Sequence, residues 1–241
     1  MIIGIAGKKR SGKNTFGNYI TGRVLKDKGL VKDFFINEEG KLLVETAFSD
    51  GSIDWGVLDL DRRDEEFYIH ASQTIWPYVK CYSFAKPLKD MIIDLFDVSE
   101  ESVYGNEEQR NVKTHINWED MPGEVTLQGP MSGIEIMQYF GTEVMRRIYD
   151  NVWVNKTIRT IQQEQPEIAI ITDLRFLNEA KAIRKNKGRL IKLTRNVLNL
   201  KHESEIALDG YRDYDMVIDN SMLSHEDFIN TLSFRFEEIA K

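Results

Sequence analysis

Short apolar runs alternating with amphipathic stretches set the pattern of this chain. Residues 1–6 are almost entirely apolar and predict a buried strand, and residues 16–28 follow helical spacing up to the helix stop Gly29. The same alternation recurs towards the carboxyl end, which predicts an α/β fold with a parallel sheet flanked by helices. Further strands are predicted at 78–84, 168–172, 189–194 and 216–220, and further helices at 91–96, 132–150 and 224–240.

Residues 31–77 break this alternation. The apolar triplets 34–36 and 42–44 flank the polar stretch 37–41, which predicts a β-hairpin, and another strand is expected at 55–60. We therefore predict a core made of residues 1–30 and 78–241, with a β-rich insertion at 31–77.

The clearest helical pattern covers residues 132–150. Ser132 and Glu135 have the spacing of a capping box. Gly141 interrupts the helix at a cost of about 1 kcal/mol against alanine, so we expect another group to approach closely there. The apolar stripe consists of Ile136, Met137, Phe140, Val144, Met145 and Ile148.

A polar segment without clear periodicity, about 97–130, precedes that helix. A stretch of this length inside a compact domain is usually functional, and we predict that it covers the substrates. The polar segment 198–209 contains His202 without a second histidine or cysteine at ligand spacing, so zinc is not predicted.

Composition narrows the class of protein. The chain has 241 residues, 41% of them hydrophobic and 29% charged, with a formal net charge of -7. An acidic chain without a basic stripe argues against nucleic-acid binding. No apolar run approaches the ~20 residues of a membrane span, and the amino end reads as a strand rather than a signal peptide, so an intracellular protein is expected. The single cysteine, Cys81, excludes an intramolecular disulfide; core packing is the simpler role, with a reactive thiol as the alternative.

The loop between the first strand and the first helix carries the strongest chemical signal. Gly7, Gly12 and Lys13 have the spacing G-x-x-x-x-G-K, in the strand–loop–helix context of a phosphate-binding P-loop. Backbone N–H groups can then surround phosphate oxygens, and the lysine amine can reach the β- and γ-phosphates. The alternative is a glycine turn that merely begins a helix.

The position after the lysine departs from the usual motif. A hydroxyl that ligates Mg²⁺ is normally found there, but this chain has Asn14, followed by Thr15. Asn14 could hold the metal through a water molecule, or Thr15 could take the ligand's place.

Polar residues also follow the other predicted strands. The carboxyl ends of parallel strands meet at one edge of a sheet, so these residues are expected near the P-loop. Lys86 and Lys89 follow strand 78–84, and Asp173 and Arg175 follow strand 168–172. A carboxylate there can hold Mg²⁺ and an arginine can reach phosphate; a salt-bridged helix start is the alternative.

Taken in order, these motifs resemble those of the deoxynucleoside monophosphate kinases of bacteriophages. The resemblance rests on Gly7–Thr15, on the turn 84–89, on the helix segment 138–143, on 172–175 with 178–179, and on 217–220. It covers most of the chain outside the insertion. It implies a P-loop kinase fold and transfer of the γ-phosphoryl group of ATP to a deoxynucleoside monophosphate, with Mg²⁺.

The resemblance also implies roles for individual residues. Lys13, Lys9, Arg110 and Arg175 are the implied catalytic residues. The implied ATP contacts are Gly7, Arg10, Ser11, Gly12, Lys13, Asn14 and Thr15. The implied acceptor contacts are Lys9, Leu88, Lys89, Arg110, Gln138, Gly141, Thr142 and Trp153. Thr15 and Asp173 are the candidate Mg²⁺ ligands.

Other functions are compatible with parts of this pattern. A kinase of another phosphorylated acceptor, of the dephospho-coenzyme A or phosphomevalonate type, shares the P-loop logic. A nucleotide switch would need Asn-Lys-x-Asp, and residues 155–158 (Asn-Lys-Thr-Ile) fail at the fourth position. The negative net charge of the chain argues against a DNA-handling ATPase. The expected partner is thus a small nucleotide, and binding to nucleic acid or to a membrane is not expected. The expected location is the cytoplasm, which would be that of the host cell if the protein is phage-encoded. A homodimer is compatible with the chain.

Overall fold

The computed structural model describes residues 1–47, 51–123, 126–195 and 207–240. The chain forms two compact units. The first unit consists of Met1–Ser83 and Thr160–Lys241, and the second unit is Phe84–Arg159. The predicted assignment of 1–30 and 78–241 to a kinase core, and of 31–77 to an insertion, stays a prediction about domain roles.

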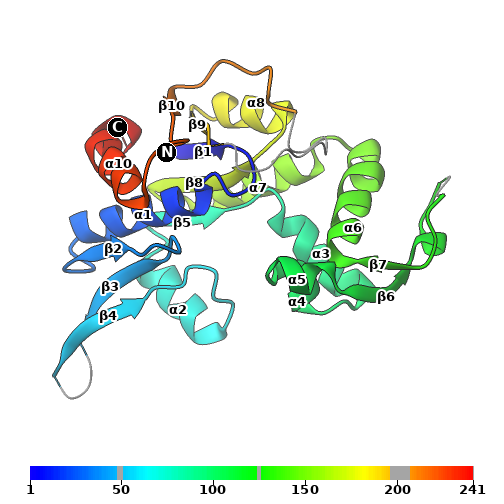
Figure 1. Cartoon of the computed structure of the whole chain (residues 1–241), viewed down its shortest axis with the longest axis horizontal. Coiled ribbons are helices and arrows are strands. Elements are labelled where there is room, and N and C mark those ends of the chain that lie inside the picture. Colours follow the sequence, from blue (N-terminus) through cyan, green and yellow to red (C-terminus); the bar gives the residue numbers. More distant parts are fainter. Residues whose placement is uncertain (48–50, 124–125, 196–206, 241) are drawn as a thin grey trace. The chain divides into compact units, whose positions relative to one another are not determined.

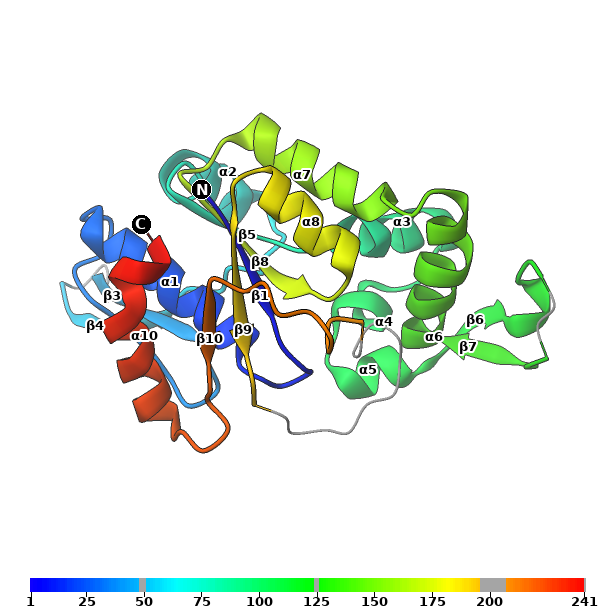
Figure 2. The same cartoon turned by 90° about the horizontal axis from the view of Figure 1, so that it is seen from above.

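A five-stranded parallel sheet forms the centre of the first unit. Its strand order is β10-β9-β1-β8-β5, and Figure 2 shows β10, β9, β1 and β8 side by side. This confirms the predicted α/β fold. The strands are β1 (Ile2–Ala6), β5 (Val79–Tyr82), β8 (Ile168–Leu174), β9 (Arg189–Leu193) and β10 (Met216–Ile218).

Helices cover both faces of this sheet because successive side chains of a strand point to opposite faces. On one face, Ile3 and Ile5 of β1 join the core cluster that includes Phe16 of α1 (Lys13–Asp27) and Phe228 of α10 (His225–Ala240). On the other, Gly4 lies against Ile183 of α8 (Leu177–Lys185). Figure 1 shows α8 and α1 on different sides of the strands. Helix α7 (Val152–Glu164) leads from the second unit into the first.

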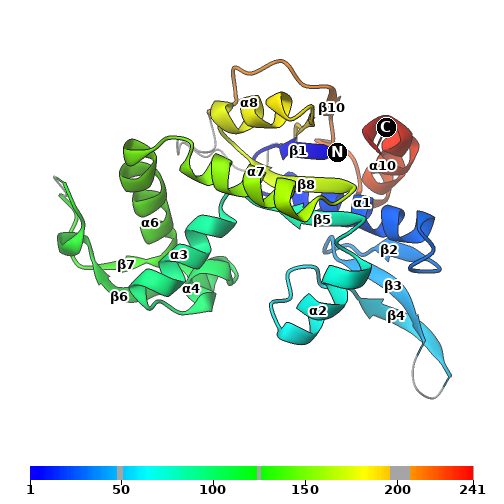
Figure 3. The same ribbon diagram turned by 180° about the vertical axis from the view of Figure 1, so that it is seen from behind.

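A small antiparallel sheet follows α1. Its strands are β2 (Phe34–Ile36), β3 (Leu42–Ala47) and β4 (Ile53–Val57), and helix α2 (Glu65–Thr74) follows them (Figure 3). The predicted hairpin is confirmed, with Phe34 paired to Val44. The strand expected at 55–60 was placed too late, because β4 takes its register from pairing with β3, whose Ala47 lies opposite Ile53. The sheet packs on α1 at Gly22, where a side chain would meet Phe34 and Leu42.

The second unit is mainly helical. The stretch predicted to lack periodicity contains short elements held by local caps and one hairpin. Its elements are α3 (Lys86–Phe96), α4 (Glu100–Tyr104), α5 (Glu107–Asn111), β6 (Lys113–Asn117), η1 (Trp118–Asp120), β7 (Pro130–Ser132), α6 (Gly133–Gln138) and the π-helix η2 (Tyr139–Arg146).

The helix predicted at 132–150 begins as expected but changes its geometry. The capping box is confirmed, since Ser132 N donates to Glu135 Oε2 at 2.7 Å and Glu135 N donates to Ser132 Oγ at 3.3 Å. From Tyr139 the chain forms a π-helix, whose hydrogen bonds span five residues instead of four. The wider turns shift the phase of the following residues, so Ile148, predicted in the apolar stripe, is 74% exposed.

The predicted strand 168–172 is longer in the structure. Strand β8 continues to Leu174, so Asp173 lies inside the strand rather than after it. The reason is that Leu174 still pairs with Ala6 of β1. The segment 198–209, where no zinc site was expected, falls largely outside the described residues.

Candidate functional site

The glycine loop lies at the carboxyl end of the central strand β1. Ser11 N donates to Lys8 O at 3.1 Å and closes a tight turn. Arg10 and Gly12 both adopt left-handed backbone conformations, with φ of 63° and 91°. At Gly12 a side chain is doubly disfavoured, because a Cβ atom there would lie 3.1 Å from Cε1 of Phe228. Position 12 therefore requires glycine, both for its left-handed backbone and for the closeness of the Phe228 ring.

Lys13 folds back over this loop. It is the first residue of α1, and its Nζ donates to Gly7 O at 2.7 Å and to Lys8 O at 2.8 Å. Within the described part of the chain no side chain caps the amino end of α1, and the first turn of this helix holds no acidic residue. The leading N–H groups of the helix and the lysine amine thus form a positive site that suits an anion.

Ser11 adds a polar group inside the loop. Its side chain is fully buried, and its Oγ has no hydrogen-bond partner among the described residues. The hydroxyl lies against Gly7, where a Cβ atom would collide with it. A buried hydroxyl without a partner is costly, so this atom suits a bound phosphate oxygen. The residues present therefore fit the triphosphate group of ATP.

The two candidate Mg²⁺-side residues of the loop differ in their surroundings. Asn14 is exposed, whereas Thr15 is half-buried. The hydroxyl of Thr15 lies against Gly40, in the turn between β2 and β3, where a Cβ atom would collide with it. The carbonyl of the same glycine is tied to α1 by a hydrogen bond from Asn18 Nδ2 to Gly40 O at 2.8 Å. The contact between the Thr15 hydroxyl and Gly40 was thus not predicted from the sequence.

Two hydrogen-bonded pairs of residues lie near the carboxyl ends of β5 and β8, at the same edge of the sheet. Ser83 Oγ donates to Asp173 Oδ2 at 2.5 Å, which fixes the orientation of that carboxylate. Arg175 N donates to Oε2 of Glu179 at 2.8 Å. Glu179 is only 2% exposed and accepts also from Phe176 N at 3.0 Å. Sequence reasoning missed Ser83 as the partner of Asp173; its place at the end of a strand was the available signal.

The predicted acceptor residues belong to the second unit, apart from Lys9 in the loop. The structure brings three of them together. A Cβ atom on Gly141 would lie 2.5 Å from Leu88 Cδ2, which confirms the expected close approach. Trp153 is 3% exposed, and its Nε1 donates to Gly141 O at 3.1 Å. These three residues belong to the buried core of the unit, so any contact with a substrate would be made from its edge.

The remaining acceptor-side residues lie nearer the surface. Lys89 Nζ lies 4.5 Å from the ring centre of Tyr104. Arg110, in α5, donates from Nε to Asn106 O at 3.4 Å. Gln138, at the end of α6, is exposed, and Thr142 in the π-helix is half-buried. Lys86, the neighbouring candidate, pairs with Asp90 at 2.7 Å.

Cys81 is the remaining residue for which the sequence left a chemical role open, that of a reactive thiol. Removal from water raises the pKa of its thiol to about 12, against the effect of a contact with Thr21 Oγ1 at 3.8 Å. The reactive form of cysteine is the thiolate. The structure therefore favours core packing over the alternative of a reactive thiol.

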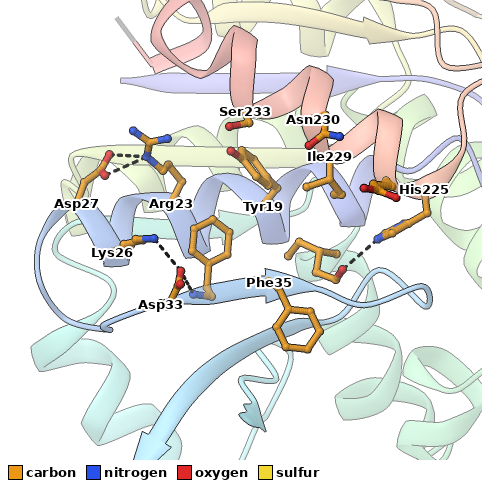
Figure 4. Close-up of a pocket in the computed structure, with 13 residues that line it drawn as sticks. Tyr19, Arg23, Lys26, Asp27, Asp33, Phe35, His225, Ile229, Asn230 and Ser233 are labelled. Carbon is orange, nitrogen blue, oxygen red and sulfur yellow. Dashed lines mark hydrogen bonds and ion pairs between the residues drawn. The ribbon is translucent and has the colours of Figure 1, made fainter. Parts of the chain in front are cut away.

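A cavity of about 630 Å³ lies elsewhere in the first unit, between α1, β2 and α10. Figure 4 shows that its charged side chains face one another: Arg23 pairs with Asp27 at 2.9 Å and Lys26 with Asp33 at 2.7 Å. His225 Nε2 lies 3.0 Å from Ile36 O. The lining contains none of the predicted site residues, so this cavity is the joint between the small sheet and the core helices.

Two absences concern the described ranges 1–47, 51–123, 126–195 and 207–240. Among those residues, no group of three or more His, Cys, Asp or Glu side chains is placed to hold a metal ion. Mg²⁺ commonly uses only one or two carboxylates plus substrate phosphates, so this finding does not conflict with the predicted cofactor. Within the same ranges, no helix combines the length and apolar content needed to cross a bilayer.

Comparison with known proteins gives one informative similarity. No family model matches the chain. A protein of Acanthamoeba polyphaga mimivirus, which carries the provisional name deoxynucleotide monophosphate kinase, is 30% identical over 165 residues. The matched region is 63% of this chain and 80% of the viral protein. Together with the P-loop at the end of a central parallel strand, this similarity shows that the chain belongs to the deoxynucleotide monophosphate kinase family.

Proposed function

We propose that this protein is a deoxynucleoside monophosphate kinase that converts a deoxynucleoside monophosphate and ATP into the diphosphate and ADP. The observation that carries the proposal is the glycine loop, in which the Lys13 amine, the leading N–H groups of α1 and the Ser11 hydroxyl converge. The similarity to the mimivirus protein supports the same activity.

Phosphoryl transfer requires positioning and positive charge rather than covalent participation by the protein. In the proposed mechanism, Lys13 and the loop amides hold the β- and γ-phosphates, and Ser11 donates to one of their oxygens. Lys9 bridges the donor and acceptor phosphates, and Arg110 or Arg175 neutralises charge in the transition state. Mg²⁺, when bound, supplies further charge neutralisation between the phosphates, with Thr15 and Asp173 as the proposed ligands on the protein. The acceptor monophosphate is already an anion, so no general base is required.

The acceptor side of the proposal concerns the second unit and Lys9. Leu88, Gly141 and Trp153 are buried in the core of this unit, while Lys89 and Thr142 are half-buried and Gln138 is exposed. We propose that the lysines bind the monophosphate group and that Gln138 and Thr142 meet the base or the sugar. The homodimer, the cytoplasmic location and the bacteriophage origin remain parts of the proposal that rest on the sequence.

Activity should be measured first on a panel of nucleoside and deoxynucleoside monophosphates with ATP and Mg²⁺, by following ADP release. The panel also separates the proposed acceptor from dephospho-coenzyme A and phosphomevalonate. In Lys13→Met the turnover should fall by about 10²–10³ or more, the scale for losing a donor that stabilises developing charge. Lys26→Met is the matched control, because Lys26 pairs with Asp33 away from the loop. Near-normal turnover of Lys13→Met would remove the P-loop from the mechanism.

A second experiment addresses the acceptor lysines. Replacing Lys9 and Lys89 together by alanine should raise the KM for the monophosphate, because two cations that attract its phosphate group are lost. Lys86→Ala is the control on the same helix, since Lys86 is engaged with Asp90. An unchanged KM in the double variant would contradict the assigned role of these lysines.

A further inference from the structure

Asn220 connects the glycine loop to the far end of the chain. It follows β10 and is fully buried. Its side-chain Nδ2 donates to Ser11 O at 2.9 Å, across 209 positions of sequence, and its Oδ1 accepts from Arg195 N at 3.0 Å. One amide therefore links the P-loop, the end of β9 and the end of β10.

The backbone of Asn220 is held in place as well. Arg195 Nε donates to Asn220 O at 2.9 Å, and Arg195 Nη2 donates to Leu223 O at 2.7 Å. The Arg195 side chain thus ties the segment after β10 to the end of β9. The Asn220 amide consequently reaches Ser11 from a fixed support rather than from a free loop.

The bond to Ser11 has a consequence for the next residue. In a trans peptide unit the C=O and the following N–H point in opposite directions. Since Ser11 O is directed at Asn220, the N–H of Gly12 is directed away from it. Gly12 adopts φ of 91°, and the ring of Phe228 lies close on its Cα side. The peptide between Ser11 and Gly12 is therefore locked in one orientation.

We propose that Asn220 is a positioning residue for the phosphate cradle: by holding Ser11 O, it keeps the Gly12 N–H turned towards the bound phosphate of ATP. This inference rests on the proposed function only in that ATP is the ligand of the loop. Without the amide, the Ser11–Gly12 peptide can rotate, and the cradle loses a donor that is otherwise fixed before the nucleotide arrives.

The test is the isosteric variant Asn220→Asp. It keeps the acceptor for Arg195 N but places an oxygen instead of an N–H donor against Ser11 O. The matched control is Asn186→Asp. Asn186 Nδ2 also donates to a backbone carbonyl, Ala182 O at 2.8 Å, while its Oδ1 accepts from Gln162 Nε2 at 2.9 Å.

Binding of ATP should be measured directly, in the full-length protein without acceptor, alongside thermal unfolding. We expect the Kd for ATP to rise at least about tenfold in Asn220→Asp, the scale of one lost hydrogen bond. In Asn186→Asp the Kd should stay unchanged. In the kinase assay, Asn220→Asp should show a raised KM for ATP and an unchanged KM for the monophosphate, a split that a general loss of stability would not produce.

Two results would overturn the inference: an unchanged Kd for ATP in Asn220→Asp, or an equal rise in both variants. If Asn220→Asp does not fold, Asn220→Ser removes the same bond with a smaller polar side chain, and the same rise in Kd is required of it. Wild-type protein that binds ATP but phosphorylates no nucleoside monophosphate would refute the proposed function and leave this inference standing. Wild-type protein that does not bind ATP would refute both.

Discussion

A methyl group added at Gly133 tests the packing of the second unit. Gly133 is the first residue of α6, directly after the cap Ser132, and it is buried. A Cβ atom there would overlap the carbonyl oxygen of Ser102, in α4, and would lie 2.7 Å from the Ser102 carbonyl carbon. These are backbone atoms, so no change of rotamer can relieve the collision, and α4 and α6 would have to separate.

The size of the effect follows from the distances. Carbon atoms normally approach to about 3.5–4.0 Å, and the overlapping carbonyl oxygen is closer still, so the two helices would have to move apart by more than about 1 Å. Overpacking that shifts the backbone typically costs about 1–3 kcal/mol, and this collision belongs at the upper end. Alanine gains about 1 kcal/mol in helix propensity over glycine. We therefore expect Gly133→Ala to lower the free energy of unfolding by at least about 2 kcal/mol.

The control for this variant is Gly210→Ala. Among the described residues other than its chain neighbours, no atom lies within 4 Å of a Cβ atom built on Gly210, and the φ of Gly210 is not in the left-handed region. Its unfolding free energy should change by no more than about 0.5 kcal/mol, as for other exposed positions. Urea unfolding followed by circular dichroism measures both changes.

The same variant has a functional readout. Gly133 lies in the second unit, which carries most of the proposed acceptor residues, whereas the glycine loop lies in the first. Gly133→Ala should raise the KM for the monophosphate more than the Kd for ATP. Equal unfolding midpoints for Gly133→Ala and the wild type would refute the contact between α4 and α6 on which the estimate is based.

Three further predictions concern single interactions. Trp153→Phe should lower the unfolding free energy by about 0.5–1.5 kcal/mol, because the hydrogen bond from Trp153 Nε1 to the Gly141 carbonyl is lost; denaturant titration measures this, and an unchanged midpoint would contradict it. Cys81 should resist alkylation at pH 8 until the protein is unfolded, because its pKa is raised to about 12; rapid labelling of folded protein would show an exposed thiolate. Hydrogen bonds from Arg62 and from the Phe67 backbone lower the pKa of Asp64 from 3.8 to about 2. The ionised Asp64 side chain therefore stabilises α2 fully above about pH 4, and this stabilisation is lost as the pH falls through about 2. A carbon NMR titration should give this value, and Arg62→Gln should move it back towards 3.8.

Local signals were enough to locate most elements of this protein. The apolar run 1–6, the glycine spacing that ends at Lys13 and the capping box at Ser132 each depend on neighbouring residues, and the structure contains all three elements. The close approach of another side chain to Gly141 was also expected, because a glycine inside a helix is unfavourable without a packing reason.

Other features depend on partners that a local pattern does not name. The hydroxyl of Thr15 lies against Gly40, and Ser83 orients Asp173, since both pairs arise from the stacking of separate chain segments. Ile148 left the buried stripe because the helix changed to π geometry, which no spacing rule foretold.

The sequence alone thus determined the five strands of the parallel sheet and the helices α1 and α10, and it predicted a phosphate site at the glycine loop, because these inferences follow from the order of neighbouring side chains. Only the tertiary structure decided the strand order β10-β9-β1-β8-β5 and, with it, the arrival of Asn220 at Ser11. Apolar periodicity specifies that a face must be buried, but the identity of the group that buries it is set by how distant segments pack together.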